Sequence, residues 1–280
     1  MFLSRLMLAA IAGVAAAGGA AAAPDWSAIP AKTVTLFAPG QSSLEWAMTK
    51  TSHRGAVKFA KGKSCAACHI GEEKPMGDVI ASGKKLEPKP IPGKPGSLDA
   101  KVQVARDAQK LYVRLEFSDA GQPDAGMSRD AAKVAMMLDG GNPEVARAGC
   151  WAMCHNDSYG MGGTGPARSM YLATPADGVS EYWEAALNDG AAPVAKSGTF
   201  ADRRRDSRPS AVEAEAAHKN GVWTVTLSRP LAAGTVGLKP GKRYTVAFAI
   251  EAGHTAGRFH YVSFERTLVL GQGAADFIAP

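Results

Sequence analysis

The sequence contains few residues of the types that hold metals, cofactors or disulfides. Its 280 residues include only four cysteines and six histidines, and aromatic residues make up 7%. Beyond the first residues, no apolar run reaches the roughly 20 residues that a membrane-spanning helix needs. Lysine and arginine are scattered without an aromatic-interleaved patch, so we expect no nucleic-acid partner. The net charge of +6 is therefore a weak guide to partners.

The first residues have the layout of a secretory signal peptide. Arg5 gives a positive start, an apolar run follows from Leu6 to Ala17, and small residues lead to Ala23. The run is too short to span a bilayer comfortably, although an uncleaved anchor is the alternative. We expect cleavage near residue 23 and export, which for an Ala-rich bacterial leader means a soluble protein in the periplasm.

The four cysteines form two close pairs, and a histidine directly follows each pair. CAACH contains Cys65, Cys68 and His69, and CWAMCH contains Cys150, Cys154 and His155. Two disulfides are the default interpretation of four cysteines in an exported chain. A histidine in the same position twice, among only six, favours covalent haem attachment instead.

CAACH matches the attachment motif of c-type haem, in which two thiols bond the porphyrin and the adjacent histidine binds the iron. A thioredoxin-like redox pair is expected in a βαβ context, and a zinc site needs further thiolates or histidines at finger-like spacing. The sequence has neither pattern. His53 and Met76 are candidate sixth ligands of the iron, and the alternative for each is a structural role.

CWAMCH is one residue longer than that motif. A change in the intervening turn can absorb the extra residue, so we favour a second haem c on Cys150, Cys154 and His155. A disulfide, a metal site and free thiols remain alternatives, although a disulfide across one helical turn is geometrically awkward. His254 and His260 flank an expected turn and are further candidate iron ligands, or else ordinary loop residues.

The remainder of the chain is mostly β in pattern. Residues 32–40, 102–105, 111–117, 133–141, 243–253 and 259–270 have strand character, and Asn220–Gly221 is typical of a hairpin turn. Residues 197–210 look like a polar loop, and His218 looks solvated. We predict a signal peptide (1–23), a c-type haem segment of loops and helices (24–83), a Pro/Gly/Lys-rich linker (84–98) and a β-sandwich haem-binding domain (99–280).

Three segments of this chain together resemble a known family. They are KLYVRLEFSD, then VAMMLDGG with PEVARAGCWAMCH, and finally VAFAIEAGHTAGRFHYVSFERTLVL. They are similar to the haem-binding domain of ethylbenzene dehydrogenase and dimethylsulfide dehydrogenase γ-subunits, and to exported c-type cytochromes that carry it behind a CxxCH segment. The resemblance implies a sandwich with a haem near one end. The γ-subunits bind a b-type haem through Met and Lys. This chain offers Cys150, Cys154 and His155 instead, which fits a covalently attached haem.

We therefore expect a periplasmic dihaem electron carrier and not an enzyme. Its redox partners would be a quinol-linked membrane cytochrome and a soluble reductase or dehydrogenase. Exposed lysines around the first motif would steer an acidic partner, or would simply keep that segment solvated. The alternatives are a haem enzyme or gas sensor with an open coordination site, such as a peroxidase or small-oxyanion reductase, a single-haem cytochrome with a disulfide at 150–154, and a sugar-binding module.

Overall fold

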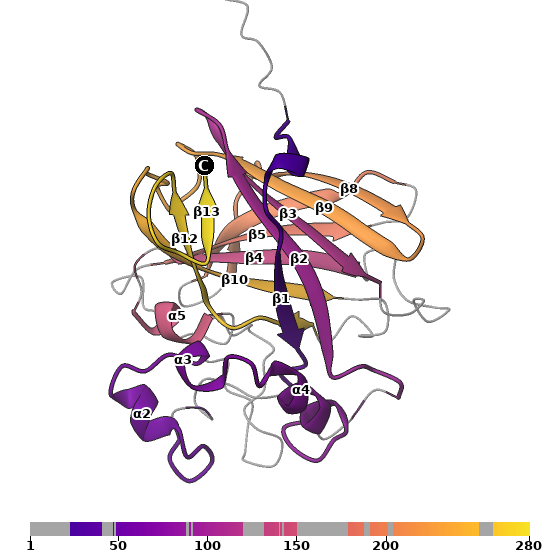
Figure 1. The fold of residues 1–280 in the computed structure, drawn as a ribbon, viewed down its shortest axis with the longest axis vertical. Coiled ribbons are helices and arrows are strands. Elements are labelled where there is room, and N and C mark those ends of the chain that lie inside the picture. Colours follow the sequence, from indigo (N-terminus) through magenta and orange to yellow (C-terminus); the bar gives the residue numbers. More distant parts are fainter. Residues whose placement is uncertain are drawn as a thin grey trace, which may run out of the picture.

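The structure is a computed structural model that describes residues 23–40, 47, 49–87, 90, 92–119, 132–139, 141, 143–149, 179–187, 191–200, 204–251 and 260–280. This part of the chain is mainly β, and the helices α2 to α5 gather at one end of the strands, whereas η1 lies at the other end (Figure 1). The helices are η1 (Trp26–Ala28), α2 (Ala56–Ala60), α3 (Ala66–His69), α4 (Glu73–Ala81) and α5 (Pro143–Ala148). Within the described residues, none of these helices is long and apolar enough to cross a membrane.

Thirteen strands are described. They are β1 (Lys32–Phe37), β2 (Ser97–Arg106), β3 (Lys110–Ser118), β4 (Ala132–Asp139), β5 (Ser180–Leu187), β6 (Val194–Phe200), β7 (Arg204–Asp206), β8 (Glu213–Lys219), β9 (Val222–Pro230), β10 (Arg243–Glu251), β11 (Tyr261–Val262), β12 (Arg266–Leu270) and β13 (Phe277–Ala279). They hydrogen-bond in the order β7-β6-β5-β4-β10-β11-β1-β2-β3-β9-β8, with β12 beside β10 and β13 beside β12. Every pairing is antiparallel except β12 with β13.

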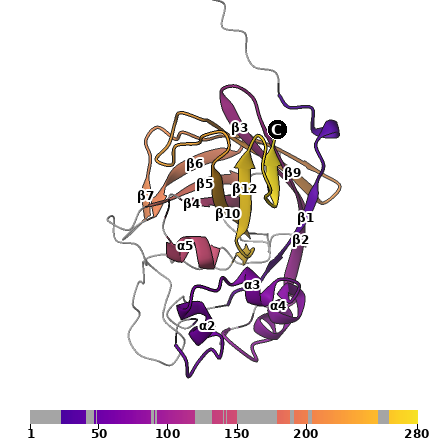
Figure 2. The ribbon, with the colours of Figure 1, turned by 60° about the vertical axis from the view of Figure 1, so that its left-hand side comes forward.

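The sheet folds over so that β5 and β6 face β9 and β8, which gives the two layers of a β-sandwich (Figures 1 and 2). The main core lies between these layers. Leu111, Val113, Leu115 and Phe117 of β3 all point into it, as their alternation predicts. The predicted β-rich, sandwich-like fold is confirmed.

A second apolar cluster covers the outer face of the central strands. On β10, Phe248 points into the sandwich core, whereas its neighbour Ala247 points outward into this cluster. Tyr182 of β5 and Met137 of β4 share that outward face, and Phe59 and Cys65 of the helical segment cover it. The central strands are therefore buried on both faces, which explains why β5 is buried almost throughout its length.

The strand β1 ties the helical segment to the sandwich. It pairs with β2 on one side and with β11 on the other, and β2 begins at Ser97. The helices α2, α3 and α4 follow β1 in the chain and lie together at one end of the strands in both views (Figures 1 and 2). Gly77 of α4 packs so closely on Gly96 that an added Cβ would overlap the Gly96 carbonyl oxygen.

The turns agree with prediction in two places and differ in one. Asp107 Oδ1 accepts hydrogen bonds from the backbone of Gln109 and Lys110 in the β2–β3 turn, and Asn220 and Gly221 have φ of +52° and +73° at the β8–β9 hairpin. The prediction of a loop over 197–210 was wrong, because β6 and β7 run through it. These strands lie at the edge of the sheet, where polar residues such as Arg205 face solvent and still pair.

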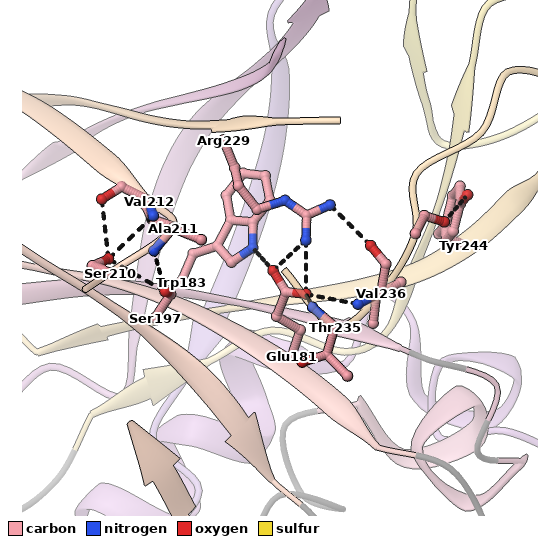
Figure 3. Close-up of polar contacts among 11 residues, drawn as sticks. Glu181, Trp183, Ser197, Ser210, Ala211, Val212, Arg229, Thr235, Val236 and Tyr244 are labelled. Carbon is pink, nitrogen blue, oxygen red and sulfur yellow. Dashed lines mark hydrogen bonds and ion pairs between the residues drawn. The ribbon is translucent and has the colours of Figure 1, made fainter. Parts of the chain in front are cut away.

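A buried ion pair joins the two layers (Figure 3). Arg229 on β9 donates to both carboxylate oxygens of Glu181 on β5 at 2.6 and 2.7 Å, and both side chains are almost fully buried. The remaining capacity of Glu181 is used by the indole N–H of Trp183 and the backbone N–H groups of Thr235 and Val236. A buried pair with this many hydrogen bonds fixes how the layers face each other.

Candidate functional site

The CAACH motif forms a single helical turn. Cys65 caps α3, and its carbonyl oxygen accepts hydrogen bonds from the backbone N–H of Cys68 at 3.1 Å and His69 at 2.9 Å. The turn places the two thiols three residues apart and the imidazole immediately after them. Cys65 is buried, Cys68 is exposed, and the two sulfurs are not joined by a disulfide.

The thiol of Cys65 lies in surroundings that keep it protonated. Burial, followed by the nearby carboxylate of Glu265, raises the pKa of Cys65 to about 12. Redox-active and zinc-binding cysteines are thiolates whose pKa is lowered by their surroundings. The environment of Cys65 therefore fits a thiol that is consumed in a covalent bond better than it fits a thioredoxin-like pair.

Residues distant in sequence hold the α3 turn in place. Glu265 Oε1 accepts a hydrogen bond from the backbone N–H of Ala66 at 2.8 Å, and Ser64 Oγ accepts one from that of Ala67 at 3.1 Å. The backbone N–H of Cys65 donates to the carbonyl oxygen of Arg147 at 2.8 Å. The first turn of α3 is thus fastened to both β12 and α5.

The helix α5 leads directly into the second cysteine motif. The guanidinium of Arg147 donates to the carbonyl oxygen of Phe59 and lies 4.5 Å from the centre of its ring. Gly149 packs against the backbone of Glu265, since a Cβ there would lie 3.1 Å from the Glu265 nitrogen. Gly149, the residue before Cys150, therefore lies beside the segment that holds the first motif.

Two histidines face each other near α3. The ring centroids of His53 and His69 are 5.9 Å apart, with 37° between the ring planes. Nδ1 of His53 lies 2.8 Å from the carbonyl oxygen of Ala47, and Nδ1 of His69 lies 2.8 Å from Glu72 Oε2. His69 also stacks on Phe264, with centroids 6.2 Å apart.

Both histidines line a cavity of about 490 Å³. Its volume falls in the range typical of small-molecule and cofactor pockets. Met76, Val79 and Ile80 of α4 form an apolar wall of this cavity. The full described lining is His53, His69, Glu72, Pro75, Met76, Val79, Ile80, Lys85 and Leu86.

A break between β11 and β12 directs the side chains of Phe264 and Glu265 toward this site. Residues 263–265 leave the strand pattern, and Ser263 holds the break by accepting a hydrogen bond from the Phe248 backbone N–H through Oγ. Phe264 then packs on His69 and on Phe37, whose ring centroid is 4.9 Å away, while Glu265 reaches Ala66. Residues 259–270 were predicted as strand without this interruption.

Sequence reasoning missed three residues of this site: Gly55, Phe264 and Glu265. All are common residue types, and no motif marks them. Except for Gly55, they also lie far from CAACH along the chain. The usable signal was Glu265 within a segment of strand pattern, FHYVSFERTLVL. A charged residue placed there requires a buried polar partner.

The other predicted site residues lie elsewhere. Cys150, Cys154, His155 and His254 fall outside the described residues. His260 is described and half-buried, just before β11. His218 was expected to be solvated, and this was wrong. Its ring stacks on Trp223, with centroids 4.5 Å apart, and Nε2 lies 3.1 Å from Asp119 Oδ2.

Positive charge is concentrated around the cavity. Residues 49–85 contain eight Lys and Arg but three Asp and Glu, a net charge of +5, whereas the whole chain carries +6. All seven lysines of this segment are exposed: Lys50, Lys58, Lys61, Lys63, Lys74, Lys84 and Lys85. The large apolar side chains of Val57, Ile70 and Val79 are also exposed in this segment.

Comparison with known proteins agrees with this arrangement. Residues 183–263 match the ethylbenzene dehydrogenase family model. Cytochrome c-552 of Stutzerimonas stutzeri is 38% identical over 94% of each chain, and cytochrome c-551 of Rhodocyclus tenuis is 32% identical over 89% of this chain and 95% of its own. A family 9 carbohydrate-binding module of Caldicellulosiruptor kristjanssonii, in complex with glucose, has 12% identity and a TM-score of 0.36 over 65% of this chain and 81% of its own, too low an overlap to bear on function.

Proposed function

We infer that this chain is an electron carrier that uses haem c, because it belongs to the family of c-type cytochromes that includes those two relatives and resembles the ethylbenzene dehydrogenase γ-subunit family. We propose that it is a periplasmic dihaem cytochrome that passes single electrons between partners of a respiratory chain. The observation that supports the proposal is that Cys65 of the first motif donates its backbone N–H to the carbonyl oxygen of Arg147, which lies three residues before Cys150 in the chain.

The first haem is held by the α3 turn. Cys65 and Cys68 provide the two thioethers, and His69 is the proximal ligand. The donor set fits the group, since both thiols stand beside an imidazole that lines a cavity with an apolar wall. Haem iron supplies reversible one-electron chemistry once it is ligated on both sides. The residues of this chain bind the group, orient His69 through Glu72, and exclude water through Met76, Val79 and Ile80.

The second haem is assigned to Cys150, Cys154 and His155. The support for this assignment is that α5 delivers the chain to this motif from a point fastened to the first motif and to Glu265. Two haems attached to one chain would exchange electrons within one molecule. His254 and His260 remain the candidates for the other side of the second iron.

The basic segment 49–85 is proposed as the docking surface for redox partners. Its net charge of +5 surrounds the cavity of the first haem, so it would attract a partner with an acidic surface and speed their encounter at low salt. The exposed Val57, Ile70 and Val79 supply apolar contact area in the same segment. The partner classes we propose are a quinol-linked membrane cytochrome and a soluble reductase or dehydrogenase.

Carbon monoxide separates an electron carrier from a haem enzyme. A carrier with both irons ligated on both sides binds CO slowly or not at all when reduced, because no coordination position is open. The experiment is to reduce the matured protein, add CO, and follow the Soret band by stopped flow. Rapid CO binding by one haem equivalent would contradict the carrier and favour a peroxidase, a small-oxyanion reductase or a gas sensor.

A further inference from the structure

The geometry points to His53 as the sixth ligand of the iron at the first motif, opposite His69. This inference rests on the proposed haem at Cys65 and Cys68 and extends it by choosing between two ligands, His53 and Met76, that the sequence leaves open. The choice sets the character of the carrier, because a Met ligand raises the reduction potential relative to a pair of histidines.

The hydrogen bonds of both rings select the same nitrogen for iron. The carbonyl oxygen of Ala47 and the carboxylate of Glu72 are acceptors only, so each Nδ1 in contact with them carries the hydrogen. In a neutral imidazole the lone pair then belongs to Nε2. A metal-binding histidine typically shows this pattern, with its other nitrogen donating to a carbonyl or a carboxylate.

The separation of the rings matches two ligands of one metal ion. Two imidazoles on opposite sides of an ion, each bonded at about 2.0–2.1 Å, have ring centroids roughly 6 Å apart. The observed separation of His53 and His69 is 5.9 Å, and both rings line the same cavity.

The backbone around His53 is built to hold the ring in that place. His53 donates its backbone N–H to the Thr49 carbonyl oxygen at 2.9 Å and accepts from the N–H of Ala56 at 3.0 Å. Gly55 lies directly against the ring, since an added Cβ would come within 2.6 Å of Cε1 and 2.8 Å of Nε2 of His53. Any side chain at position 55 would therefore displace the imidazole.

Met76 has a different role in the same cavity. It lies on α4 and packs against the apolar cluster that contains Phe37, Phe264 and Phe59. That packing makes it part of the cavity wall, and Met is well suited to filling such gaps.

The ligand assignment is tested by near-infrared magnetic circular dichroism and low-temperature EPR of the oxidised, matured protein. The wild type should show a bis-imidazole signature for at least one haem equivalent, that of the first motif. His53→Met should convert that equivalent to a His–Met signature and raise its potential, whereas Met76→Leu and the distant control His218→Gln should leave it bis-imidazole. A wild type without any bis-imidazole haem, or loss of that signature in Met76→Leu, would overturn the assignment.

Gly55→Ala tests the positioning step without touching a ligand. We expect its bis-imidazole signals to shift and part of one haem equivalent to become high-spin, with recovery on adding imidazole. Gly237→Ala is the matched control, because a Cβ there meets open space. Unchanged spectra in Gly55→Ala would contradict the role of this ring.

Intact mass separates this inference from the proposed function. An unmodified Cys65–Cys68 pair would contradict the proposed haem, whereas an attached haem without His53 ligation would contradict only this inference.

Discussion

At the scale of single residues, the site combines a motif that can be recognised in the sequence with supporting residues that cannot. CAACH identifies Cys65, Cys68 and His69 because the spacing itself carries the chemistry. No such spacing marks Glu265. Its role depends on a strand break that brings it to Ala66, 199 positions away in the sequence. Local spacing predicts covalent attachment, and only the three-dimensional fold shows what holds it.

Glu265 should make stability depend on pH. Burial raises the pKa of this carboxyl, against the hydrogen bonds from Ser64 and Ala66. The folded protein therefore keeps a proton that the unfolded chain releases, so the free energy of unfolding falls as pH rises from the ordinary value near 4.5 through the raised folded value.

Glu265→Gln removes this titration and keeps an oxygen that accepts from Ala66. The variant should gain stability relative to the wild type as pH rises from 4.5 toward 7, measured by urea unfolding of the matured protein followed by circular dichroism. Parallel stability curves for the two proteins over that range would show that Glu265 does not contribute in this way.

At the scale of secondary structure, period-two alternation predicted the inner strands well and the edge strands poorly. The alternation of β3 reflects one face in the core, and Asn220–Gly221 marks its hairpin neighbours because a tight turn needs positive φ. The strands β6 and β7 escaped notice because edge strands keep polar residues. The burial of β5 along nearly its whole length results from a second covered face, on which the haem segment packs.

The docking of α4 depends on the absence of a side chain at Gly77. In an exposed helix, Gly→Ala stabilises by about 1 kcal/mol. Here the Cβ would overlap the Gly96 carbonyl oxygen, so Gly77→Ala should instead destabilise by roughly 1–3 kcal/mol, the usual range for overpacking.

Urea unfolding measures the effect of Gly77→Ala, and Gly237→Ala provides the comparison in open space. The control should change the free energy of unfolding by less than about 0.5 kcal/mol. If Gly77→Ala proves more stable than the wild type, α4 does not pack as closely on Gly96 as described.

At the scale of the whole molecule, one sheet connects every part. The insertion of β1 between β11 and β2 could not be predicted, because nothing in a strand's own sequence specifies partners more than 60 or 200 residues away. The proposed division into a haem segment, a linker and a sandwich describes chemistry along the chain. The pairing of β1 joins the first and last of these parts in space.

The Glu181–Arg229 pair should matter to the whole fold because it links the layers. Arg229→Met leaves a buried carboxylate without its partner, which costs about 3–5 kcal/mol. Combining it with Glu181→Gln removes the buried charge while keeping an acceptor for Trp183, so the double variant should recover at least half of that loss.

An exposed pair gives the matched control. Lys101 and Glu116 lie 2.9 Å apart on the surface, and Lys101→Met should cost at most about 1 kcal/mol. Chemical unfolding of all four proteins gives the comparison. Equal losses in the single and double variants would mean that the charge of Glu181 is not what the layers depend on.

The most direct measurement of the central claim is the intact mass of the protein after maturation with the c-haem assembly machinery. We predict a polypeptide that begins near residue 24 and carries the added mass of two haems, and a Cys150→Ala/Cys154→Ala variant that carries one. A wild-type protein with the mass of a single haem would contradict the dihaem account and return the Cys150–Cys154 pair to a disulfide or another role.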